Sequence, residues 1–236
     1  MTMPETRPPV APGEAAPNFT LPAVDRDENV SLTDYRGRSP VFLALLVGLW
    51  CPFCRRQIAQ IGTLEGKLKA LGVESLAVVA TPPDNARLYF KFRPTRVRLA
   101  SDPELFTHRA YGIPRPTPSP ELMEALSTTK INPDGVLPEP MPIIDAATAV
   151  GRLDGYAETK ADQADMERQW PQLKGQFLID RAGIVRWANI ECASEGLAGL
   201  GKFPPEESIL GAAQRAEPLA FSAASVAVSP ARRDRV

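Results

Sequence analysis

Residues 41–56, VFLALLVGLWCPFCRR, decide the fold of this chain. The run 41–47 is apolar without interruption, as expected of a β-strand that is buried on both faces of a sheet. A helix is predicted directly after it, over about residues 52–71, because apolar side chains recur at spacings of three and four. These side chains are Ile58, Ile61, Leu64, Leu68 and Leu71, and Gly72 follows them as a terminator. The stretch therefore predicts a buried strand that leads into a helix, with two cysteines at the junction.

These cysteines, Cys51 and Cys54, form a C-x-x-C motif. At a helix N-terminus the free backbone N–H groups and the helix dipole stabilise a thiolate, and can lower a cysteine pKa from about 8.5 to about 3.5–7.5. Pro52 suits the first turn because its missing N–H is not needed there. Cys54 lies on the same helical face, so its sulfur can reach Cys51. We predict that Cys51, at the exposed end, attacks an oxidant or a disulfide, and that Cys54 resolves the product.

The residues beside the cysteines are candidates for supporting roles. Arg55 and Arg56 add positive charge, which favours an anionic sulfur. Trp50 could form an apolar wall of the site, or it could pack in the core, the commoner role of aromatic residues. Phe53 lies within the motif itself. The alternative for the cysteines is that both are buried small hydrophobic residues that perform no reaction.

The rest of the chain alternates between strand and helix patterns. Further strands are expected at residues 18–21, 30–32, 73–80 and about 97–99, and a hairpin of residues 177–180 and 184–187 turns at 181–183. Further helices are expected with Asp84 as N-cap, with Asp102 as N-cap and Pro103 as first residue through residue 111, and over about residues 205–216. This order predicts an α/β fold with a mixed central sheet and helices on both faces.

Proline marks the expected domain organisation. Of 25 prolines, six lie in the first 22 residues and eight between Pro114 and Pro142. We expect an extended lead-in over residues 1–15, one domain over 16–216, and a disordered tail over 217–236. An insertion of about residues 115–173 interrupts the domain and is expected to be ordered but irregular. It could cover the active site, recognise a partner or help to form a homodimer.

Composition and charge narrow the functional classes. The formal net charge is −1, so nothing steers the molecule toward nucleic acid or an anionic membrane. The N-terminal residues contain no apolar core of a signal peptide, and the longest apolar run, 41–50, is too short to span a bilayer. We therefore expect a cytoplasmic protein. In that compartment thiols are kept reduced, so a C-x-x-C motif indicates redox chemistry or metal binding rather than a structural disulfide.

Three stretches carry a family resemblance. They are APNFTLPAVDRDENVSLTDYRGRSPVFLALLVGLWCPFCRRQI at 16–58, LASDPELFTHRAYGI at 99–113 and GQFLIDRAGIVRW at 175–187. In this order they resemble the thioredoxin superfamily and, within it, the peroxiredoxin-like proteins of the alkyl hydroperoxide reductase/thiol-specific antioxidant family that carry a C-P-x-C motif. The resemblance implies a thioredoxin-like fold with an N-terminal β-hairpin. It also implies a hydroperoxide substrate, a thioredoxin-like or low-molecular-weight thiol as reductant, and no metal or organic cofactor.

The chain departs from this family at three positions. The family's proline and threonine or serine before the reactive cysteine fall on Ala44 and Gly48, so the hydroxyl that would bind a peroxide is missing. The family's distant arginine falls on Lys174, which keeps the charge but not the planar donor geometry. Lys174 also stands where thioredoxins carry a cis-proline. The alternative is that Lys174 is an ordinary exposed lysine.

Two further residues have chemistry to offer. His108 is the only histidine, and we expect it on the surface of a helix. Cys192 could be a second resolving thiol, but a bystander is favoured because Cys54 is already beside Cys51. A zinc site of these residues with Cys51 and Cys54 is disfavoured because only the first pair has metal-like spacing.

Three functions follow from these observations. The first is a thiol-dependent peroxidase, in which Cys51 attacks hydrogen peroxide or an organic hydroperoxide and Cys54 closes a disulfide. The second is a thiol–disulfide oxidoreductase that uses the same cysteines on protein disulfides. The missing hydroxyl favours the second, and the scaffold without a cis-proline at Lys174 favours the first. The third is a non-catalytic redox-sensing or binding module.

Overall fold

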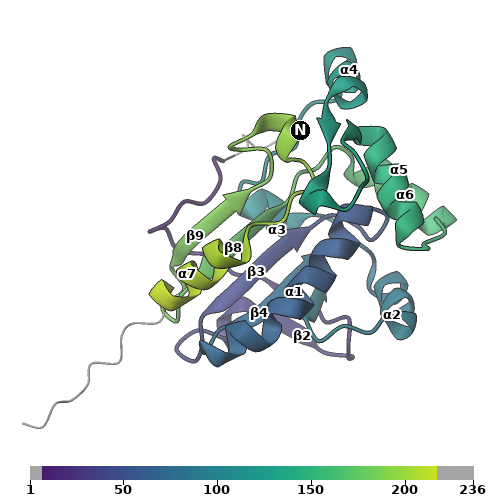
Figure 1. Cartoon of the computed structure of the whole chain (residues 1–236). Coiled ribbons are helices and arrows are strands. Elements are labelled where there is room, and N and C mark those ends of the chain that lie inside the picture. Colours follow the sequence, from purple (N-terminus) through teal and green to yellow (C-terminus); the bar gives the residue numbers. More distant parts are fainter. Residues whose placement is uncertain (1–6, 217–236) are drawn as a thin grey trace, which may run out of the picture.

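The computed structural model describes residues 7–216 of the chain (Figure 1). The expected disordered tail and residues 1–6 of the expected lead-in lie outside the described residues. A five-stranded sheet in the order β5-β4-β3-β8-β9 forms the centre. Its strands are β3 (Val41–Leu46), β4 (Glu74–Val79), β5 (Arg98–Ser101), β8 (Gly175–Ile179) and β9 (Val185–Ile190). Strands β3, β4 and β5 are parallel, and β8 is antiparallel to both β3 and β9, which confirms the mixed sheet.

The central strand β3 is buried on both faces, as its apolar run predicts. Phe42 and Leu46 belong to one core cluster, whereas Leu43 and Leu45 belong to the other, on the opposite face of the sheet. Since successive side chains of a strand point to opposite faces, only a continuous apolar run can serve both cores. This arrangement fixes the position of the cysteines that follow the strand.

Helices and a hairpin cover the two faces. Helices α1 (Pro52–Ala70) and α7 (Glu206–Ala216) pack on one face, where Figure 1 shows them in front of the sheet. The hairpin β1 (Thr20–Pro22) and β2 (Asn29–Ser31) pairs antiparallel and contributes Leu21 and Val30 to the core on the other face. Within residues 7–216, no helix is long and apolar enough to cross a lipid bilayer.

Two helices begin at other residues than the sequence indicates. Helix α2 (Pro83–Phe92) has Pro82 in the cap position, so Asp84 lies inside its first turn. Helix α3 (Phe106–Ala110) begins after Leu105, which adopts a left-handed conformation with φ 56°. Asp102 therefore caps no helix that starts at Pro103. Instead, its Oδ2 accepts hydrogen bonds from the backbone N and the Oγ1 of Thr107, both at 2.7 Å.

The expectation of an irregular insertion is wrong. Residues 115–173 form the helices α4 (Pro120–Thr128), α5 (Ile143–Leu153) and α6 (Lys160–Gln169), and a small sheet of β6 (Lys130–Ile131) and β7 (Met141–Pro142). The prolines do not prevent this, because proline is tolerated in the first helical turn and Pro120 stands at the start of α4. Thr159 and Asp162 form a capping box that starts α6. Within residues 7–216, three short 3-10 helices complete the fold: Leu32–Asp34, Pro133–Gly135 and Gly196–Gly199.

Candidate active site

The two cysteines lie at the junction of β3 and α1. Cys51 is the N-cap residue of α1, Pro52 is its first residue, and the backbone N of Cys54 donates to the Cys51 carbonyl at 3.1 Å. Both cysteines are free thiols. The expectation that Cys51 is exposed is wrong: it is 7% exposed and Cys54 is fully buried. The two cysteines thus lie at the helix N-terminus, as the motif predicts, but both side chains are buried.

The surroundings of Cys51 favour its thiolate. A hydrogen bond from the Cys54 thiol and the nearby positive charge of Lys174 lower the pKa of Cys51 to about 6, although burial opposes this. Burial, together with the bond to Cys51, raises the pKa of Cys54 above its usual value. At neutral pH the arrangement therefore supplies one nucleophilic sulfur and one protonated neighbour.

The sequence suggests that Arg55 supplies the positive charge that stabilises the Cys51 thiolate, but in the structure Lys174 supplies it. One Arg55 nitrogen donates to the carbonyls of Leu49 at 2.8 Å and Trp50 at 3.2 Å, and the other faces Asp154 at 3.5 Å. Arg55 thus holds the loop before Cys51, and its other nitrogen faces Asp154 rather than the sulfur. Arg56 also pairs with Asp154, at 3.4 Å.

Lys174 is not an ordinary exposed lysine. It is 2% exposed, and its Nζ pairs with Glu191 Oε1 at 2.8 Å. Burial by itself lowers a lysine pKa, but Glu191 and the two cysteines raise the pKa of Lys174 above its usual value. The two residues face one another because Lys174 precedes β8 and Glu191 follows β9, and Gly175 pairs with Ile190 in the ladder. A buried lysine stays charged when a carboxylate compensates it, so this pair holds a permanent cation beside the thiols.

Gly48 stands where the family has a threonine or serine, and the residues around it explain why no side chain fits there. A Cβ at this position would meet the Trp50 ring at 2.5 Å and Gln169 Oε1 at 2.6 Å. The amide oxygen of Gln169 instead accepts hydrogen bonds from the Gly48 backbone N at 2.6 Å and from Trp50 Nε1 at 2.7 Å. Gln169 Nε2 donates to the Ala80 carbonyl at 2.6 Å. A threonine therefore does not fit where the family pattern has one.

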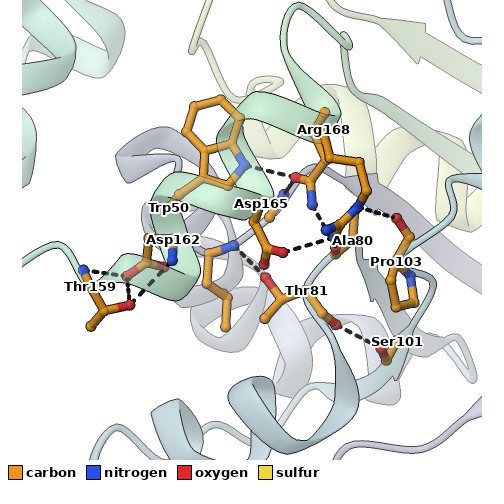
Figure 2. Close-up of polar contacts among 12 residues, drawn as sticks. Trp50, Ala80, Thr81, Ser101, Pro103, Thr159, Asp162, Asp165 and Arg168 are labelled. Carbon is orange, nitrogen blue, oxygen red and sulfur yellow. Dashed lines mark hydrogen bonds and ion pairs between the residues drawn. The ribbon is translucent and has the colours of Figure 1, made fainter.

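Helix α6 is tied to the strand ends around this loop, as Figure 2 shows. Arg168 donates to the Asp165 carboxylate at 2.8 Å and to the Pro103 carbonyl at 3.3 Å. Thr81 Oγ1 accepts from the Leu49 backbone N at 2.8 Å. With Gln169, these contacts fix the insertion and the Cys51 loop to one another.

An apolar cavity of about 140 Å³ opens onto Cys51. Leu122, Leu126 and Ala147 of the insertion line it, opposite Pro52 and Phe53. Its other lining residues include Val47, Trp50, Trp170, Pro171, Leu197 and Leu200, with Lys174 and Glu191 as the charged pair. Of the roles that the sequence leaves open for the insertion, covering Cys51 is the one seen here.

The structure has a cis-proline near the site, contrary to expectation. The peptide bond between Trp170 and Pro171 is cis, three residues before Lys174, and Pro171 lines the same cavity as Cys51. The family resemblance assigns the cis-proline position of thioredoxins to Lys174, so the sequence alone indicates no cis-proline here.

The two remaining candidates lie outside the cavity. His108 is not a surface residue: α3 begins later than expected, which leaves Phe106 61% exposed and His108 fully buried. Burial lowers the pKa of His108 to about 4. Cys192 is half-buried, and burial raises its pKa to about 12, so it stays a thiol at neutral pH. Among the described residues, no three His, Cys, Asp or Glu side chains gather as a metal-binding group.

Sequence analysis misses Glu191 and Gln169. Glu191 compensates Lys174, and its Oε1 also accepts from the Gly201 backbone N at 2.9 Å. Gln169 lies 121 residues after Gly48, its bonding partner. The only available signal for Glu191 is its place next to the predicted hairpin. No pattern in the sequence marks Gln169.

Comparisons with known proteins agree with this geometry. The chain is 30% identical over 103 residues to a Mycobacterium tuberculosis protein named as a peroxiredoxin, which covers 44% of this chain and 64% of the relative. It is 35% identical over 108 residues to the thiol-disulfide oxidoreductase ResA of Halalkalibacterium halodurans, which covers 45% of this chain and 59% of the relative. The matches thus span about three fifths of the length of these curated relatives.

Solved structures share the fold. The peroxidoxin BcpB of Mycobacterium tuberculosis superposes with a TM-score of 0.54 at 14% identity, over 89% of this chain and 99% of that one. The reduced 2-Cys peroxiredoxin of Plasmodium vivax gives a TM-score of 0.54 at 17% identity, over 86% of this chain and 79% of that one. The family model of the AhpC/TSA family matches residues 12–139, more than half of the chain. This peroxiredoxin-like chain with a thioredoxin-like fold therefore belongs to the AhpC/TSA family.

Proposed function

We propose that this chain is a thiol-dependent peroxidase, in which the Cys51 thiolate reduces a hydroperoxide and Cys54 resolves the product. The observation that carries the proposal is the cover over a nucleophilic sulfur: Cys51 is 7% exposed and opens into an apolar cavity of about 140 Å³. The peroxide end of a small organic hydroperoxide can enter a cavity of this size, with the carbon part of the molecule against the apolar lining. A disulfide on the surface of a folded protein does not reach Cys51 unless the insertion moves.

The reaction transfers two electrons from sulfur to peroxide. The Cys51 thiolate attacks the terminal peroxide oxygen, the O–O bond breaks, and Cys51 becomes a sulfenic acid. The departing alkoxide or hydroxide takes a proton and leaves as alcohol or water. Cys54 then attacks the sulfenic sulfur, so that an S–S bond forms and water leaves with the Cys54 proton.

Lys174 supports the first step in two ways. Its charge lowers the pKa of Cys51 and keeps the sulfur anionic. Its ammonium has three N–H groups, of which Glu191 engages one, so N–H groups remain for a peroxide oxygen. We propose that Lys174 thereby replaces both the missing hydroxyl at Gly48 and the family's arginine. The guanidinium of Arg55 acts through the loop carbonyls and not on the sulfur.

The cycle needs a reductant for the Cys51–Cys54 disulfide. On the strength of the family assignment we propose a thioredoxin-like protein or a low-molecular-weight thiol. We propose the cytoplasm, where thiols are kept reduced, as the compartment. The sulfurs supply both electrons of the peroxide reduction, so the steps call for no bound metal or organic cofactor.

A second candidate function is thiol–disulfide exchange with a protein substrate. It is favoured by the absence of a side-chain hydroxyl at Gly48 and by the similarity to a thiol-disulfide oxidoreductase. In that reaction Cys51 attacks a disulfide sulfur, a thiolate of the substrate leaves, and Cys54 breaks the mixed disulfide. This function requires that helices α4 to α6 give way at the cavity.

Trapping the first intermediate distinguishes the two functions. Reduced Cys54→Ser protein is mixed with cumene hydroperoxide and a sulfenic acid reagent, and the adduct is located by mass spectrometry. The peroxidase predicts one adduct, on Cys51, formed at the rate of peroxide consumption. The matched control Cys192→Ser removes the third thiol and should leave rate and adduct unchanged. An adduct that forms no faster than on a free cysteine would overturn the proposal.

A further inference from the structure

A second and larger cavity lies on another side of α1, and neither Cys51 nor Cys54 lines it. It is an open groove of about 660 Å³ between α1, α2 and the turn after α5. We call it the arginine groove. Its charged and aromatic lining residues are Arg55, Arg56, Arg93, Arg96, Asp154, Tyr89 and Phe90.

The charges of this groove do not balance. Four guanidinium groups line it, against the single carboxylate of Asp154. Asp154 is shared by Arg55 at 3.5 Å and Arg56 at 3.4 Å. Within residues 7–216, neither Arg93 nor Arg96 forms an ion pair, and both are exposed. The chain as a whole has a net charge of −1, so the excess of cations is local to the groove.

A buried donor at the base of the groove also lacks a partner. The Arg55 side chain is 4% exposed, and its Nε makes no hydrogen bond with any described residue. The same guanidinium lies 4.2 Å from the Tyr156 ring centroid, and the guanidinium of Arg93, the C-cap residue of α2, lies 5.4 Å from that centroid. Leaving a buried N–H unpaired costs free energy, which an acceptor from a ligand would recover.

We propose that the arginine groove binds a small molecule that carries two or more oxyanion groups, either phosphates or carboxylates. Guanidinium groups pair with both groups in a planar, two-bond geometry, and they keep their charge at any physiological pH. One oxyanion would face Arg55 and Arg56 of α1, and another would face Arg93 and Arg96. The half-buried rings of Tyr89 and Phe90 offer apolar surface to the carbon part of the ligand.

The same site is coupled to the cysteines through Arg55. This residue donates to the carbonyls of Leu49 and Trp50, which directly precede Cys51. An anion that bonds to Arg55 changes how tightly that loop is held. The groove therefore offers a route by which an anionic metabolite changes the reactivity of Cys51.

Calorimetric titration with two probes tests the site. Pyrophosphate and citrate are titrated into the reduced full-length protein at constant ionic strength, and the two arms distinguish phosphate from carboxylate ligands. We expect saturable binding of at least one probe at one site per chain. The double variant Arg93→Gln/Arg96→Gln should weaken it by at least about tenfold, and both residues are exposed, so folding is not at risk. Arg38→Gln removes an exposed arginine outside the groove and should leave the affinity unchanged.

Two results would overturn the site. One is the absence of saturable binding by both probes. The other is weakening by Arg38→Gln that is as large, per charge removed, as the weakening by the double variant, which would mean that only the overall charge matters. Binding is measured without any peroxide, so its failure is separate from a failure of the proposed peroxidase. The thiolate absorbance of Cys51 near 240 nm, titrated against pH with and without the probe, then reports the coupling through Arg55.

Discussion

Two sides of the same helix hold charge in different ways. At the N-terminus of α1, one ammonium, Lys174, meets one carboxylate, Glu191, and both are buried beside Cys51 at the edge of a small apolar cavity. Along the flank of α1, Arg55 and Arg56 share Asp154 in an open groove that also receives Arg93 and Arg96. The first region is closed and balanced, whereas the second is open and cationic.

The difference follows from what each region must stabilise. A buried charge needs a partner within the protein, because water cannot solvate it, so the cation beside Cys51 comes with its own carboxylate. Water solvates an exposed guanidinium, so this group needs no partner within the protein and can bind an anionic ligand. The charges that lower the pKa of Cys51 are therefore paired within the fold. The guanidinium groups of the arginine groove are not all paired within the described residues, which suits the groove to an anionic ligand. The four predictions below test the closed and balanced region around Cys51.

The largest effect is expected from the nucleophile. Cys51→Ser should slow oxidation by cumene hydroperoxide by at least about a thousandfold, because a serine hydroxyl is not ionised at neutral pH. Single-turnover stopped-flow tryptophan fluorescence measures this. Cys192→Ser is the control, since its thiol lies outside the cavity. A Cys51→Ser protein that still consumes hydroperoxide at the wild-type rate would remove the cysteine from the mechanism.

The second largest effect is expected from removing the buried positive charge of Lys174. Lys174→Met removes a positive charge that helps to lower the pKa of Cys51, so less thiolate is present and oxidation at pH 7 should slow by up to about tenfold. It also leaves Glu191 buried and unpaired, which costs about 3–5 kcal/mol of stability. The double variant Lys174→Met/Glu191→Gln separates the two effects, because it should recover stability but not rate. Lys130→Met, which removes an exposed lysine that forms no ion pair with a described residue, should change neither.

Gln169 should matter for the cover more than for the chemistry. Gln169→Leu leaves the Gly48 N–H, the Trp50 indole N–H and the Ala80 carbonyl without their partner, at about 1–3 kcal/mol for each group that stays unpaired. We expect a lower urea midpoint and faster reaction with a bulky disulfide probe, because α6 is released from the Cys51 loop. The exposed Gln163→Leu on the same helix is the control. Unchanged access to the probe would show that the cover is held elsewhere.

The smallest effect is a pH dependence of stability. The pKa of Cys51 is about 6 in the folded protein and about 8.5 in an unfolded chain, so the unfolded state binds more protons between these values. The stabilisation is therefore complete above about pH 8.5 and is lost as the pH falls through about 6. Urea unfolding of wild type and Cys51→Ala at pH 5.5, 7 and 8.5 isolates it. A difference between the two proteins that does not grow with pH would contradict the lowered pKa.

The local features of the site could be predicted from the sequence. A continuous apolar run, a stripe of apolar side chains and Pro52 are enough to place Cys51 at the start of a helix, because each depends on neighbours in the chain. Family resemblance added Lys174. Its burial could not be predicted, because the partner that permits it, Glu191, comes from the other strand of the hairpin.

Contacts between residues far apart in the chain could not be predicted from the sequence, and the physical reason can be given for each. A regular hairpin across residues 181–183 would set Ile190 opposite Lys174, but a bulge between Leu178 and Ile179 shifts the register by one residue. A shift of one residue exchanges the two faces of a strand, so the facing residue is Glu191. The prolines of the insertion predict breaks rather than helices, because proline interrupts a helix interior, although Pro120 begins one of the helices.

Competition for the reduced protein tests the central claim most directly. Reduced wild-type protein is mixed in a stopped-flow instrument with equal concentrations of cumene hydroperoxide and an oxidised protein disulfide, and the products are counted after one turnover. The account predicts that cumyl alcohol accounts for nearly all of the oxidised Cys51–Cys54 pairs, because the cavity admits the hydroperoxide and excludes the protein. Reduction of the protein disulfide in preference to the hydroperoxide would contradict it.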